Sequence, residues 1–324
     1  MRVTNSMLVS SFMGNLSSNT ARLMELQNQL SSGKKSASIS DDPVSLIYSQ
    51  QARQRLQRLE MYQKNIQTTG EWLTQTESAL SDLNEVIKSA MEACVTAAND
   101  IENAGDRQNT AEYIAQLRDH FLNTLNSTYG TKFVFGGYDT TGYTNANGEK
   151  ANPFTVNAAG DLLFNGEEVT PAPGTTTNLG NIRDDVLTFD LGLGVEMEAT
   201  MNGVDVAVYN GDENIYGLLS DLFDELSGDS PDAETISGFI SKFQDAQEHI
   251  LGLTAELGGR QNRLEMLENR YSMDEINYTQ MKSDAEDADI AEVIMNLKMA
   301  EAVYNAALAA GANIIQPTLM DFLR

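Results

Sequence analysis

The sequence predicts a mainly α-helical protein with a β insert: a long antiparallel coiled coil or helical bundle made from both chain ends, and a small antiparallel β domain in the middle. Near both ends, apolar residues recur in steps of three and four over long stretches, which is the spacing of a helix face. The middle is instead rich in glycine and in short β-favouring runs. We therefore divide the chain into an N-terminal helix with its joint, two bundle halves flanking the insert, and a C-terminal helix: 1–42, 43–129, 130–212, 213–284 and 285–324.

The first helix is predicted to end at a marked joint. Gly33 suits the left-handed cap that closes a helix, and Asp42 followed by Pro43 suits the cap and first turn of the next helix. We treat these three residues as a hinge. The helix before them carries a coiled-coil seam, with one polar member, that consists of Val9, Phe12, Leu16, Asn19, Leu23, Leu26 and Leu30.

Two long helices are predicted to follow the same rule. One runs from Pro43 to about residue 101 and is followed by a breaker at 102–109 and a shorter helix. The helical pattern returns at about Asn214, and after a turn and cap near Pro231 a second long seam covers 236–281. We expect the two long seams to pack against each other, and an antiparallel pairing brings both chain ends to the same end of the bundle.

The insert is predicted from short β-rich runs separated by turn signals such as "NANGE" and "MNG". These runs are "KFVF", "FTV", "DLLF", "VLTFDL", "VEMEATM" and "VDVAVY".

The last helix carries a seam and a second apolar stripe beside it. Each terminal helix needs a partner, because a single helix with a narrow apolar face is marginal in water. Placement at the extreme ends favours an assembly surface, although the periodicity fits an ordinary intramolecular bundle equally well. The seam is Ile290, Val293, Leu297, Ala300, Tyr304, Ala307, Gly311 and Ile314, and the stripe is Ile294, Leu308 and Ile315.

The composition argues against several functions. A net charge of −26 disfavours nucleic acid and anionic membrane as partners. One cysteine excludes an internal disulfide, and the two histidines lack metal-ligand spacing, so we expect no metal, no cofactor and no enzyme activity. The stretch "SGKKS" is not a phosphate loop, because Asn28 and Lys35 stand where that motif needs Gly and Ser or Thr.

Three segments resemble the flagellin superfamily: "QLSSGKKSASISDDP" (29–43), "GGRQNRLE" (258–265) and the stretch 285–323, which begins "AEDADIAEVI". The resemblance covers essentially the whole helical part of the chain. Three further features favour the hook–filament junction branch of the superfamily over filament flagellins. These are "TKFVFGGYDTT" at 131–141, "IKSAMEACVTAAND" at 87–100, and the ending "QPTLMDFLR".

The resemblance implies a structural subunit that forms a ring with copies of itself between hook-associated protein 1 and flagellin. It also implies an export chaperone on the C-terminal helix, and an extracellular place in the bacterial flagellum after export without a cleaved signal peptide. Two alternatives stay open: a filament flagellin, and a secreted adhesin or enzyme that displays the β insert on a flagellin-like frame.

Overall fold

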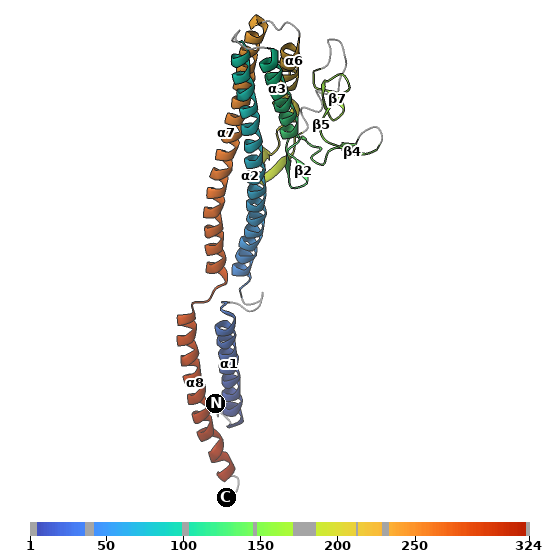
Figure 1. The fold of residues 1–324 in the computed structure, drawn as a ribbon. Coiled ribbons are helices and arrows are strands. Elements are labelled where there is room, and N and C mark those ends of the chain that lie inside the picture. Colours follow the sequence, from blue (N-terminus) through green and yellow to red (C-terminus); the bar gives the residue numbers. More distant parts are fainter. Residues whose placement is uncertain are drawn as a thin grey trace. The chain divides into compact units, whose positions relative to one another are not determined.

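The computed structural model describes residues 5–35, 42–98, 104–144, 148–170, 186–211, 213–228 and 233–321 (Figure 1). The helices are α1 (Asn5–Ser32), α2 (Pro43–Ala98), α3 (Ala104–Leu125), α5 (Gly203–Ala207), α6 (Ile215–Ser227), α7 (Ala233–Glu286) and α8 (Ile290–Asp321). Within the described ranges, none of them combines the length and the apolar character that crossing a membrane requires. The predicted fold class, long antiparallel helices from both chain ends with small antiparallel sheets between them, is confirmed.

The chain forms two compact units. The central unit comprises Glu60–Tyr271, and the terminal unit comprises Met1–Leu59 with Ser272–Arg324. The boundaries fall inside α2 and α7, so each long helix contributes to both units.

In the central unit, α2 and α7 pack antiparallel along the predicted seams. Tyr62 stacks on Tyr271 with ring centroids 6.1 Å apart, Gln261 Nε2 donates to Glu77 at 2.8 Å, and Gln247 Nε2 donates to Asn84 at 3.3 Å. The predicted seam positions of α2 between 59 and 97 are buried, apart from the half-buried Tyr62. Burial of apolar side chains along α7 ends at Tyr271, so the last predicted positions of that seam lie beyond the apolar core.

The described residues of the β insert form four small antiparallel sheets. Three of the sheets have two strands each: β1 (Thr128–Tyr129) with β2 (Lys132–Phe133), β3 (Tyr143–Thr144) with β4 (Lys150–Ala151), and β8 (Thr188–Gly192) with β9 (Val195–Glu198). In the fourth, β6 (Leu162–Phe164) lies between β5 (Phe154–Val156) and β7 (Glu167–Glu168). The β8–β9 hairpin lies against the long helices, because Tyr271 Oη donates to the Leu191 carbonyl at 2.6 Å and Asn65 Nδ2 donates to that of Asp190 at 2.7 Å.

Two local predictions are wrong. The run "VDVAVY" forms the short helix α5, because the Asn202 side chain accepts from Val204 N at 2.9 Å and caps it, and close packing at Gly203 fixes it in place. The breaker at 102–109 is instead largely helical, since α3 begins at Ala104. Asp106 in its first turn favours a helix N-terminus.

Candidate assembly surface and its joint

The terminal helices α1 and α8 pack antiparallel against each other. Leu26, Val293 and Leu297 form a small buried cluster, with Leu23 and Ala300 packed on it. At the other end of the pair, Phe12 lies against Gly311 so closely that an added Cβ would sit 2.4 Å from the Phe12 Cζ atom. The two helices therefore contact each other from the Leu26 cluster to the Phe12–Gly311 contact.

The structure places most predicted seam residues in this helix–helix contact. In α1, five are half-buried and Leu26 is buried, whereas Leu30 is exposed. In α8, Ala300, Tyr304 and Ala307 are half-buried, while Ile290 is exposed. The five half-buried residues of α1 are Val9, Phe12, Leu16, Asn19 and Leu23. These seams are largely used within one chain.

A second apolar surface of the terminal helices faces solvent. In the predicted stripe, Ile294 is 43% exposed and Leu308 is 44% exposed. The third stripe residue, Ile315, and the seam residue Ile314 lie in α8, but their side chains are outside the described part of the structure. The sequence analysis missed further exposed residues on the same two helices. We call the exposed set the outer stripe: Met7, Leu8, Met13, Met24, Leu30, Ile290, Ile294, Met295, Met299, Val303 and Leu308. Methionine is prominent here, and its flexible side chain adapts to uneven partner surfaces.

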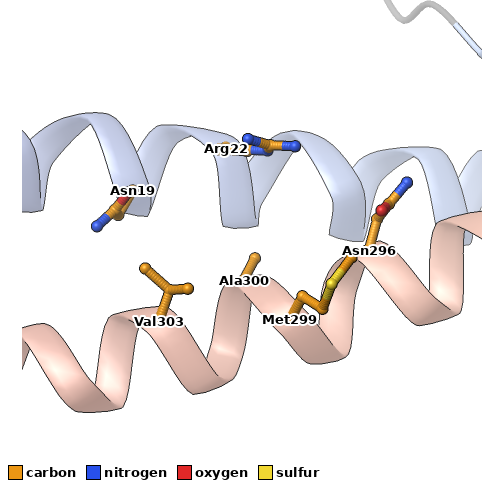
Figure 2. Close-up of a pocket in the computed structure, with 6 residues that line it drawn as sticks. All are labelled: Asn19, Arg22, Asn296, Met299, Ala300 and Val303. Carbon is orange, nitrogen blue, oxygen red and sulfur yellow. The ribbon is translucent and has the colours of Figure 1, made fainter.

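A shallow groove of about 200 Å³ lies between the two terminal helices. Figure 2 shows Asn19 and Arg22 on α1 and, across from them, Asn296, Met299, Ala300 and Val303 on α8. Among the described residues, no carboxylate lies within ion-pair distance of Arg22. The groove thus combines an apolar wall with a cation.

The joint between α1 and α2 has the predicted caps. Gly33 takes the left-handed conformation, with φ +69°, directly after α1. Asp42 Oδ1 accepts from Val44 N and Ser45 N, both at 3.1 Å, and Ser45 Oγ donates to Asp42 Oδ2. These bonds, with the Ser45 hydroxyl first, hold the pKa of Asp42 below its usual value. The part of the predicted joint at 36–41 lies outside the described residues.

The joint between α1 and α2 is hydrogen-bonded to the joint between α7 and α8. Lys35 N donates to the Glu286 carbonyl at 2.7 Å, and Ala288 N donates to the Gly33 carbonyl at 2.9 Å, as in a short antiparallel ladder. Lys35 Nζ adds a bond to the Asp284 carbonyl at 2.6 Å. Two chain segments about 250 residues apart in sequence are thereby tied together.

A buried carboxylate sits beside this ladder. Glu286 is 7% exposed, and its side chain accepts from Lys34 Nζ at 3.0 Å, from Arg53 Nε at 2.5 Å, and from Ser49 Oγ. We call these four residues the Glu286 clamp. Arg53 above all, then the Ser49 and Lys34 bonds, lower the pKa of Glu286 to about 2 against the opposing effect of burial.

Sequence reasoning missed the clamp, because Glu286 lies in an acidic run whose members look alike. The available signal was weak: Ser49 and Arg53 are four residues apart and share a helix face.

Known proteins resemble this chain over nearly its whole length. It is 26% identical to "Flagellar hook-associated protein 3" of Escherichia coli (strain K12) over 94% of this chain and 96% of that protein. The chain is thus similar to flagellar hook-associated protein 3 over most of the length of both proteins. The family model for the bacterial flagellin N-terminal helical region matches residues 3–140, and "Flagellin" of Bacillus subtilis (strain 168) is 25% identical over 100% of both chains.

The fold of this chain also has a solved counterpart. A structure described as a putative flagellar hook-associated protein from Vibrio parahaemolyticus superposes with a TM-score of 0.64 at 20% identity. It covers 76% of this chain and 100% of that one.

Proposed function

We propose that this chain is a structural, non-enzymatic subunit of the bacterial flagellum that forms the junction ring between hook and filament. The observation that carries the proposal is the match to hook-associated protein 3 over nearly the full length of both proteins. The ring would join hook-associated protein 1 on one side to flagellin on the other, after export through the flagellar apparatus with a chaperone on the C-terminal helix.

Within this role, we assign the contacts between subunits to the outer stripe and to the groove. The predicted seam residues include the buried cluster that packs α1 against α8 inside one chain, and we propose that this pairing presents the outer stripe to neighbouring subunits. The outer stripe leaves many large apolar side chains exposed on the two terminal helices, and exposed apolar side chains in such number favour an interaction surface.

The test is complementation of a strain that lacks its own junction protein. Ile294→Glu combined with Leu308→Glu places two charges in the outer stripe without touching the buried cluster, and we expect the monomer to fold but filaments to be lost. Leu251→Glu is the matched control, because Leu251 is 51% exposed and lies on α7. Normal filaments with the double variant would refute the assigned surface.

A filament flagellin is the second candidate, favoured by the end-to-end match to the Bacillus subtilis flagellin. Purified protein added to filament seeds separates the two. We expect a junction subunit to remain monomeric or to form only short homopolymers. Growth of long homopolymers would instead show that the chain acts as a filament flagellin.

A further inference from the structure

We propose that the exposed methionines of the outer stripe form an oxidation-sensitive site, and that a peroxide which converts their thioethers to sulfoxides blocks assembly of the subunit. This inference rests on the proposed function, because it takes the outer stripe as the surface that neighbouring subunits cover.

The first argument is the unusual exposure of methionine in this chain. Methionine is normally among the more buried residue types. The chain has 14 methionines, and in the described part nine of them are between 44% and 68% exposed. Figure 2 shows the Met299 side chain, with its sulfur, at the groove between α1 and α8. Five of the nine belong to the outer stripe and are 55–63% exposed: Met7, Met13, Met24, Met295 and Met299.

The second argument is that a peroxide reaches these five sulfur atoms directly from solvent. Hydrogen peroxide is small and uncharged, so the net charge of −26 does not repel it. Separating α1 from α8 only adds to the exposure of the five side chains. We therefore expect the free subunit to be open to oxidation whether or not its two terminal helices are paired.

The third argument is that the single thiol of the chain does not compete for the oxidant. Cys94 is buried, and burial raises the pKa of its thiol to about 12. The thiolate is the reactive form of cysteine, and a thiol with such a pKa is almost wholly protonated at neutral pH. Oxidation therefore falls on the exposed thioethers.

The reaction transfers one oxygen atom. A lone pair of the thioether sulfur attacks one oxygen of hydrogen peroxide, the O–O bond breaks, and the other oxygen leaves as water. The sulfur is oxidised by two electrons and the peroxide is reduced by two. The product is a polar sulfoxide in place of a flexible apolar side chain. Covering it with a neighbouring apolar surface leaves its oxygen without a hydrogen-bond donor, which disfavours the contact.

The first experiment treats the purified full-length protein with hydrogen peroxide and follows each methionine by peptide mass spectrometry. We expect the stripe methionines to oxidise roughly tenfold faster, or more, than Met197 and Met201, which are 4% and 6% exposed. Met61 and Met266, which are 51% and 66% exposed outside the stripe, should react as fast as the stripe. Equal rates for exposed and buried methionines would overturn the site.

The same treatment of flagella isolated from the complemented strain tests whether assembly covers the site. The stripe methionines should react roughly tenfold more slowly there than in the purified protein, because neighbouring subunits cover them. Unchanged rates would overturn the link between the site and assembly. Absence of the chain from the flagella would instead refute the proposed function, on which the inference rests.

Variants of the five stripe methionines test the effect of polarity on assembly. Met→Gln at all five positions imitates the sulfoxide with an unbranched polar side chain that favours helices, and we expect filaments to be lost in the complementation assay. Met→Leu at the same positions stays apolar and should restore filaments. Met61→Gln combined with Met266→Gln is the matched control and should also restore them. Filaments with the glutamine variant, or their loss with the leucine variant or the control, would overturn the proposal.

Discussion

The central and terminal units use different means to hold helices from the two ends of the chain together. The central unit buries large side chains on several elements, among them Trp72, Phe121 and Phe243, which are at most 2% exposed. The terminal unit buries a few aliphatic side chains and leaves most of its large apolar residues in water. The contrast teaches that the first unit is stabilised by an ordinary apolar core, and the second by a thin seam together with a polar clamp.

The largest effect should come from the central core. Phe121→Ala removes a fully buried ring and should lower the free energy of unfolding of the central unit by about 3–5 kcal/mol. Trp72 is the only tryptophan and lies in this unit, so its fluorescence during denaturation reports the central unit alone. Leu26→Ala, in the terminal cluster, should leave that fluorescence midpoint unchanged; a matching shift would mean that the two units unfold together.

A smaller effect is expected from crowding the terminal seam. Gly311→Ala places a methyl group against the Phe12 ring, and overpacking of this kind lowers stability by roughly 1–3 kcal/mol. Amide exchange should rise in α1 and α8 but not in the central unit. Adding Phe12→Leu should restore part of the protection, and no restoration would show that the two residues do not compete for the same space.

The clamp should make the terminal unit sensitive to acid. Because the folded pKa of Glu286 is about 2 and the ordinary glutamate value is 4.5, its stabilisation is present above pH 4.5 and is lost as the pH falls from 4.5 through 2. We expect the terminal unit to lose about 1–2 kcal/mol of its free energy of unfolding over this pH range. This is less than the pKa shift alone implies, because water screens the Lys34 and Arg53 side chains, which are 43% and 44% exposed.

The Glu286 titration can be measured directly by carboxyl NMR. A titration midpoint near the ordinary glutamate value in the intact monomer would contradict the clamp. The clamp would also be contradicted if α1 and α8 were as sensitive to acid in the Glu286→Gln variant as in the unaltered protein.

The smallest effect concerns the cap of α1. Gly33→Ala forces a side chain into the left-handed region and should destabilise the terminal unit by about 1 kcal/mol. Gly14→Ala is the opposite case, because nothing lies within 4 Å of a Cβ at this position inside α1, and it should stabilise the helix by a similar amount. Exchange in α1 should move in opposite directions in the two variants.

Much of this architecture follows from local sequence rules. The seams are visible because burial repeats every three to four residues, and the caps at Gly33, Asp42 and Pro43 are visible because each residue type suits one backbone conformation. Short-range patterns failed where tertiary packing decides, as in α5, whose valines favour strands but are held in a helix by the Asn202 cap and close contacts at Gly203.

The clamp and most of the outer stripe could not be read from the sequence for a different reason. The partners of Glu286 lie more than 230 residues away, and no local pattern marks which acidic residue will be buried. The stripe residues, such as Met24 and Met299, fall beside the seam, where periodicity does not separate a contact surface from ordinary exposed side chains. Both features require the pairing of α1 with α8.

The most direct test of the account is to locate the protein on isolated flagella by electron microscopy with a specific antibody. If the chain is a structural subunit of the junction, we expect a single narrow band of label between hook and filament. Label along the whole filament, or none on the flagellum, would contradict it.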